Sequence, residues 1–227
     1  MKFPKRNIDV TLYQNEVKTL LNDVGCSIFI DTNILSQLYR LNDKARQDFY
    51  NWVESCGDRF HIPTWVIHEY SNKIYSENIK DYLSELSKIK TYTKEFGNIA
   101  DFVKGYIGES LLRGSAYQGK TEDLKKDIDN IASTLEKISR AITNNLTEHQ
   151  NTVHEEIVKQ LESKVLPSDI FSIVSNAENI FSQRSHNRIP PGYKDSAKEE
   201  NNAGDYIIWT EILQFCKKNK VGKAILI

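Results

Sequence analysis

Short, uninterrupted apolar runs and longer stretches with helical spacing follow one another along the chain. The run from Cys26 to Ile30 is bounded by Gly25 on one side and by Asp31 on the other. Such a run is typical of a fully buried strand in a parallel sheet. Residues at helical spacing come next, namely Ile34, Leu35, Leu38 and Tyr39. We therefore expect Asp31 where a strand turns into a helix, with a short helix before it over residues 15–23.

The same order of elements is repeated twice more. Apolar residues near position 50 predict a helix, a break follows at 56–58, and residues 60–62 predict a second strand. The pair Pro63-Thr64 is suited to opening a further helix, which would carry Glu69. Near the other end, residues 206–216 predict a helix and residues 224–227 a strand. Alternating strands and helices predict an α/β fold with a parallel sheet.

The pattern changes between these parts. Residues 79–113 predict one long helix, and a second begins near Thr121. Apolar residues of the second helix are spaced 4-3-4-3-4, a heptad stripe formed by Leu124, Ile128, Ile131, Leu135, Ile138 and Ile142. This favours an antiparallel helical hairpin, coiled-coil-like, that packs on itself or on a copy of the protein. The predicted domains are an α/β core of residues 1–77 and 184–227 and a helical insertion of residues 78–183.

Composition limits the choice of partners. The 227 residues have a net charge of −1, so total charge gives no reason to expect nucleic acid or an anionic membrane. Residues 181–223, however, hold eight Lys and Arg against five Asp and Glu. Four of these bases precede Asp205 on a predicted loop, where they are candidates for holding phosphates or simply a solvated face: Arg184, Arg188, Lys194 and Lys198. Three widely spaced cysteines, with no bilayer-spanning run and no signal peptide, predict a cytoplasmic protein without a membrane partner.

Four acidic residues are candidates for chemistry. Taken singly, Asp31 and Asp205 are explained as helix caps, Glu69 as a solvated surface group and Asp195 as a turn residue. Together, acids at a strand end and at helix starts would converge at one edge of a parallel sheet. Carboxylates that converge repel each other unless a cation neutralises them, and oxygen ligands suit Mg²⁺ or Mn²⁺. Beside a basic loop, such a cation would serve hydrolysis of a phosphodiester by a metal-activated water.

Three segments resemble the PIN-like nuclease domains: residues 28–33, 62–70 and 204–209. The loop 189–195 looks like that of a bacterial subgroup whose core is interrupted by a long helical insertion. The resemblance covers about residues 24–77 and 184–227. It implies a Rossmann-type parallel sheet and a metal-dependent ribonuclease site, with Asp31 and Asp205 as metal ligands and Glu69 as the helix-borne acid. It also implies that Asn33 orients Asp31 and that Asp195 is an additional acid.

One departure from the family pattern concerns the last strand. PIN domains usually have a further Asp just after the strand that matches residues 224–227, and no such residue follows Ile227 in this sequence. We therefore expect the C-terminal end of the core to be truncated.

The leading hypothesis is an Mg²⁺- or Mn²⁺-dependent endoribonuclease, in the role of a toxin or phage-defence effector, with single-stranded or duplex DNA as another substrate. The alternative is an inactive PIN-like assembly module that binds a copy of itself or another protein through the helical insertion. A haloacid-dehalogenase-type phosphatase ranks lower, because that chemistry needs a second Asp two residues after the first, and this chain has Asn33.

Overall fold

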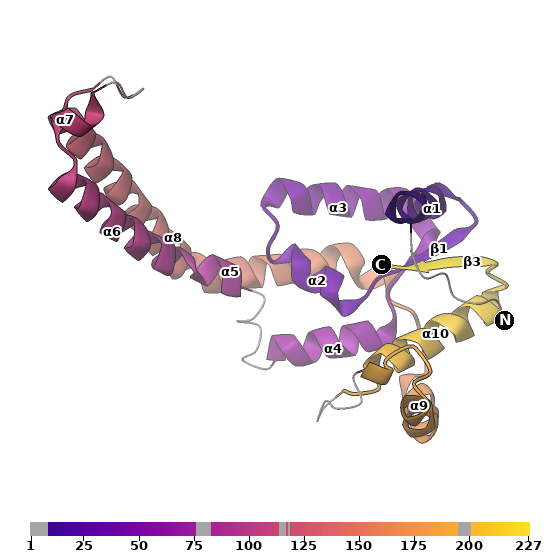
Figure 1. The fold of residues 1–227 in the computed structure, drawn as a ribbon. Coiled ribbons are helices and arrows are strands. Elements are labelled where there is room, and N and C mark those ends of the chain that lie inside the picture. Colours follow the sequence, from indigo (N-terminus) through magenta and orange to yellow (C-terminus); the bar gives the residue numbers. More distant parts are fainter. Residues whose placement is uncertain (1–8, 76–82, 114–116, 118, 195–200) are drawn as a thin grey trace. The chain divides into compact units, whose positions relative to one another are not determined.

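The chain forms two compact units. The computed structural model describes residues 9–75, 83–113, 117, 119–194 and 201–227 (Figure 1). The first unit joins Met1–Glu77 to Glu156–Ile227, and the second is Asn78–Glu155. In the described residues, no helix combines the length and the apolar character that crossing a bilayer requires.

A small parallel sheet forms the centre of the first unit. Its order is β2-β1-β3, with β1 at Cys26–Phe29, β2 at Phe60–His61 and β3 at Lys223–Leu226. Ile28 pairs with Phe60 on one side and with Ile225 on the other. All four residues of β1 are buried, as expected for a central parallel strand that is covered on both faces. The strand predicted from the apolar run at 26–30 is confirmed.

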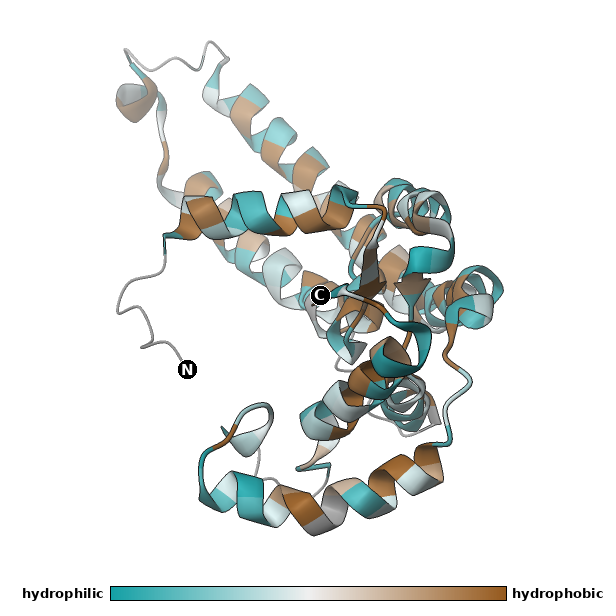
Figure 2. Cartoon of the chain, turned by 90° about the vertical axis from the view of Figure 1, so that its right-hand side faces the viewer, coloured by the Kyte–Doolittle hydropathy of each residue, from teal (hydrophilic) through white to brown (hydrophobic). Residues whose placement is uncertain are grey.

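Helices cover both faces of this sheet. In Figure 1, α1 and α3 lie on one side of the strands, and α4, α9 and α10 lie on the other. Phe60 packs against Phe49 and Trp52 of α3, whereas Phe29 packs against Phe215 of α10. The predicted α/β fold is confirmed, and the strands are largely brown, the colour of hydrophobic residues, in Figure 2. The helical elements of this unit are α1 (Val10–Asn22), α2 (Thr32–Leu38), α3 (Asp43–Cys56), η1 (Gly57–Arg59), α4 (Thr64–Tyr75), η3 (Glu162–Lys164), α9 (Ile170–His186) and α10 (Gly204–Asn219).

Helix α9 belongs to the first unit rather than to the second. Its residues Ile173, Ala177 and Phe181 form a buried cluster with Ala203 and Ile207 from α10 and the residue before it. Residues 156–183, which the sequence analysis assigned to the insertion, therefore lie with the α/β core. Because α9 extends to His186, Arg184 lies in its last turn and not in a loop, as the sequence analysis had placed it.

The second unit is made of helices. It contains α5 (Ser84–Ser87), α6 (Ile89–Tyr106), α7 (Glu109–Leu112) and most of the 41-residue α8 (Thr121–Leu161). The single helix predicted over 79–113 is wrong for the described part of that range. Ile107 adopts an extended conformation (φ −90°, ψ 112°) and Gly108 follows it, so the chain leaves the helix there. Helix α8, by contrast, is unbroken from Thr121 to Leu161.

Arg46 on α3 is a buried cation within the first unit. Its side chain is 3% exposed and donates to the Leu41 carbonyl at 2.8 Å, to Asp43 at 2.7 Å and to Glu156 at 2.9 Å. These contacts join α3 and the turn before it to the C-terminal part of α8.

Replacing this cation tests how much that junction contributes. We expect Arg46→Ala to lower the free energy of unfolding by about 2–3 kcal/mol, because the Leu41 carbonyl and Glu156 lose their donor. Urea unfolding measures the change. The exposed neighbour provides a control, since Arg40→Ala should stay within about 0.5 kcal/mol of the native chain. Equal effects of the two substitutions would contradict this account.

Candidate functional site

Asp31 lies at the carboxyl end of β1, as the sequence predicts. Its backbone N–H donates to the Ile227 carbonyl at 2.8 Å, which continues the pairing of β1 with β3. It is also the N-cap of α2, and Oδ1 accepts a hydrogen bond from the Thr32 N–H at 2.7 Å. Oδ2 accepts from Asn33 Nδ2 at 2.7 Å. Both oxygens are thus oriented, and each keeps a lone pair for a further partner.

Glu69, on α4, is held by donors from three segments. Oε2 accepts a hydrogen bond from the Thr32 hydroxyl at the start of α2. Oε1 accepts from the Trp65 indole N–H at 3.1 Å and from Asn201 Nδ2 at 2.6 Å. The side chain is partly buried, so it is not the freely solvated surface acid that an isolated Glu on a helix usually is.

Asp205 lies in the first turn of α10 and is exposed. The residue before it, Gly204, is buried, and a Cβ added there would lie 2.6 Å from Glu69 Oε1 and 2.6 Å from Asn201 Oδ1. The N-terminus of α10 therefore approaches Glu69 so closely that a side chain at position 204 would displace the Glu69 carboxylate. Gly192, at φ +79°, belongs to a turn that approaches Asp205 from another side, with 3.2 Å between an added Cβ and the Asp205 Cβ.

These contacts bring Glu69 against the residue after Asp31 and against the residue before Asp205. Among the residues that it describes, no three or more His, Cys, Asp or Glu side chains are grouped so that they could hold a metal ion. The donor chemistry nevertheless fits a hard divalent cation, since all three side chains offer carboxylate oxygens with lone pairs to spare.

Glu211 is a buried acid that the sequence analysis missed. It lies on α10, is 1% exposed, and binds backbone N–H groups at the start of α4. Oε1 accepts from the Thr64 N–H at 2.6 Å and from the Ser168 hydroxyl at 2.6 Å, and Oε2 accepts from the Trp65 N–H at 3.2 Å. A carboxylate at a helix N-terminus satisfies N–H groups that have no partner within the helix and interacts favourably with the helix dipole. Glu211 thus fixes α4 relative to α10, the helices that carry Glu69 and Asp205.

The predicted phosphate-binding residues behave differently from one another. The Arg184 guanidinium lies 4.6 Å from the centre of the Tyr206 ring and donates to the Pro190 carbonyl, so it shapes the turn before α10. Arg188 and Lys194 are exposed. Asp195 and Lys198, predicted as an additional acid and a phosphate contact, lie outside the described residues.

Thr32 and Asn201 are the other residues that sequence reasoning did not find. Thr32 follows Asp31 directly and was given no role of its own within the segment 28–33. Asn201 stands three residues before Gly204, in the pair Asn201-Asn202, which offered a polar signal at the entrance to a helix. Neither contact with Glu69 could be inferred from spacing, because the partners come from separate elements.

A parallel sheet with polar side chains at the carboxyl ends of its strands is the arrangement by which α/β proteins bind ligands at that edge. The chain belongs to the PIN like domain family, whose sequence model matches residues 27–227. PIN domains are generally nucleases. A search of curated proteins and a search of solved structures each return no match.

The close approach at Gly204 can be tested with the indole N–H of Trp65. In Gly204→Ala the new methyl group would push away the flexible ends of Glu69 and Asn201, whereas the backbone can stay in place. We expect the thermal midpoint to change by only a few degrees, while the Trp65 indole signal shifts clearly in an amide–proton NMR spectrum. Only three Trp indoles contribute to that region.

Gly97 provides the matched control, because a Cβ there meets nothing within 4 Å. Gly97→Ala should leave the Trp65 signal unchanged. An unshifted Trp65 signal in Gly204→Ala would show that Glu69 is not held against the start of α10.

Proposed function

We propose that this chain is a metal-dependent endoribonuclease whose acids are Asp31, Glu69 and Asp205. One observation carries the proposal. Glu69 accepts a hydrogen bond from Thr32, which adjoins Asp31, and lies against Gly204, which adjoins Asp205. The chain belongs to a family whose members are generally nucleases.

The chain's own contacts give each acid a role. Asp31 and Glu69 are oriented by hydrogen bonds before any ligand arrives, which lowers the cost of binding a cation at this edge. Asp205 is exposed and would complete the set of oxygen ligands. When bound, Mg²⁺ or Mn²⁺ lowers the pKa of water and offsets the negative charge of a phosphodiester. Asn33 acts through Asp31, which it holds by its side-chain amide.

The substrate would lie across the same edge. Arg188 and Lys194 are exposed on the segment that follows α9, and this segment turns at Gly192 beside Asp205. Cations at these positions, with Lys198 further along the chain, would bind the phosphates of a strand whose scissile bond lies near the acids. RNA is the preferred substrate on the ground of the family resemblance.

Neutralising single acids tests the assignment. We expect Asp31→Asn, Glu69→Gln and Asp205→Asn each to reduce cleavage of an end-labelled single-stranded RNA by at least about 100-fold, the scale of losing one charge-stabilising group. Circular dichroism should show unchanged helix content. Asp48→Asn, an exposed acid on α3, should cleave normally. Full cleavage in excess EDTA would contradict the proposal, and faster cleavage of the matching DNA strand would overturn the choice of RNA.

Metal binding has a readout that does not depend on activity. At Mn²⁺ concentrations about 100 times the dissociation constant, binding should stabilise the fold by about 2.7 kcal/mol. For a chain of this size, that is a rise of about 5–10 °C in the thermal midpoint. Asp31→Asn should lose most of this rise, while Asp48→Asn should keep it. If the thermal midpoint of the native chain does not change when Mg²⁺ or Mn²⁺ is added, the result would favour the inactive assembly module instead.

A further inference from the structure

The helices α6 and α8 form an antiparallel hairpin in the second unit. Lys104 of α6 binds Asp129 of α8 at 2.9 Å, and further along, Lys90 and Lys94 line the same groove as Ser139 and Arg140. Residue numbers thus rise on one helix as they fall on the other. Ala100 is 2% exposed and Ser139 is 8% exposed, so two small residues lie at the interface between the helices.

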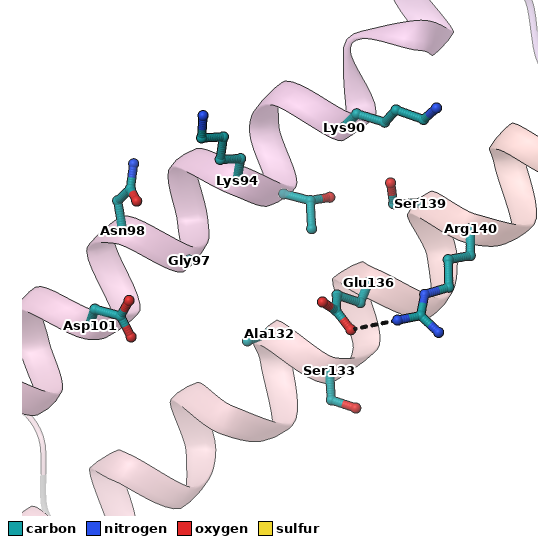
Figure 3. A pocket seen from close by; sticks show the side chains of 11 residues that line it. Lys90, Lys94, Gly97, Asn98, Asp101, Ala132, Ser133, Glu136, Ser139 and Arg140 are labelled. Atoms are coloured by element: carbon teal, nitrogen blue, oxygen red, sulfur yellow. Dashed lines mark hydrogen bonds and ion pairs between the residues drawn. The ribbon is translucent and has the colours of Figure 1, made fainter.

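One side of the hairpin is polar. A groove of about 660 Å³ runs between the two helices, and charged and polar side chains line it (Figure 3). They include Lys90, Lys94, Asp101, Ser133, Glu136 and Arg140. Arg140 and Glu136 bind each other at 3.3 Å within it.

The opposite side carries most of the exposed large apolar residues of the hairpin. Successive residues of a helix are rotated by about 100°, so Ile99 and Asp101 flank Ala100 on opposite sides, as Ile138 and Arg140 flank Ser139. Because Asp101 and Arg140 face the groove, Ile99 and Ile138 lie on the side away from it. Six large apolar residues share this side and are 44–73% exposed, and together we call them the apolar flank: Tyr92, Ile99, Phe102, Tyr106, Ile131 and Ile138.

The heptad stripe of α8 explains why the apolar flank stays exposed in the hairpin of a single chain. Of its six apolar residues, Ile131 and Ile138 remain largely exposed, whereas the other four are half-buried. Helix α6 carries a second stripe at the same spacing, Tyr92, Phe96, Ile99, Val103 and Tyr106. A single partner helix cannot bury an apolar stripe of this width. In a four-helix bundle, each helix buries such a stripe against two neighbours. Hydrophobic and hydrophilic turns alternate along these helices in Figure 2.

We propose that the apolar flank binds a second copy of this chain, with the two hairpins side by side in opposite directions. The residues of this interface belong to the second unit, whereas Asp31, Glu69 and Asp205 belong to the first, so the proposal does not rest on the nuclease site.

The area of the apolar flank is sufficient for a dimer. With roughly 200 Å² for each fully exposed side chain, the six residues offer about 650 Å² per chain. Two copies would bury about 1,300 Å², within the range of about 1,200–2,000 Å² for specific interfaces. A two-fold axis would relate the two copies, because each copy contributes the same surface to the interface.

Charged residues at the edge of the apolar flank favour an antiparallel arrangement of the two hairpins. Lys88 lies beside the flank where α6 begins, and Asp123 and Asp127 lie beside it where α8 begins, near the other end of the hairpin. A copy in the same direction would place like charges together. A copy in the opposite direction places Lys88 of each chain near the aspartates of the other, with Ile99 near the axis.

The mass of the full chain in solution tests the interface. Sedimentation equilibrium at about 1–100 µM should give twice the chain mass of 26.2 kDa. Ile99→Glu should weaken association by at least about 100-fold, because it buries a charge among apolar residues. Asn98→Glu, the adjacent residue on the groove side, should remain a dimer. A monomeric native chain, or equal effects of the two substitutions, would overturn the proposal.

Cross-linking keeps the test decisive should Ile99→Glu fail to fold. Ile99→Cys introduces a small apolar side chain, and a short thiol-specific cross-linker should join its two copies. Tyr92→Cys should cross-link to Tyr106→Cys in a mixture of the two variants, and neither should cross-link to itself. Self-linking of Tyr92→Cys without mixed linking would show copies that run in the same direction and would overturn the proposed arrangement.

Discussion

The carboxylate of Glu69 is the constraint on which the candidate site depends. It accepts hydrogen bonds from α2, from its own helix and from the segment before α10, so three separate parts of the fold meet at two oxygen atoms. A partly buried acid is stable only when such donors are supplied. The same donors fix where the acid points, which means that the fold orients this group at the edge of the sheet without help from a ligand.

Glu211 holds the start of α4, the helix that carries Glu69. Its carboxylate replaces the missing hydrogen-bond partners at the start of α4, and each such bond to a charged group contributes about 1.5–3 kcal/mol. Because Trp65 binds Glu211 through its backbone and Glu69 through its indole, the two acids are joined by one residue. One residue thus links the contact that stabilises the start of α4 to the contact that orients Glu69.

Sequence patterns predicted the parts of this fold that depend on neighbours in the chain. The buried β1 strand, the position of Asp31 at its end and the long α8 followed from local spacing. The helix break at Ile107 and Gly108 was missed because apolar residues continue at helical spacing through it. Gly105 and Gly108 were the local signal for this break. The contacts of Glu69 with Thr32 and Asn201, and of Glu211 with Thr64, could not be predicted, since the partners lie 37, 132 and 147 residues apart in the sequence. Such contacts exist only after the elements have packed.

The long separation of these partners also bears on synthesis. A growing chain on the ribosome exposes β1 and α4 early, but Asn201 and Glu211 emerge only after the whole helical hairpin has been made. Until then the N–H groups of Thr64 and Trp65 lack their carboxylate, and the acid on α4 lacks one of its donors. In an incomplete translation product the start of α4 would therefore be less firmly held, and the site would be completed only as the last helix docks.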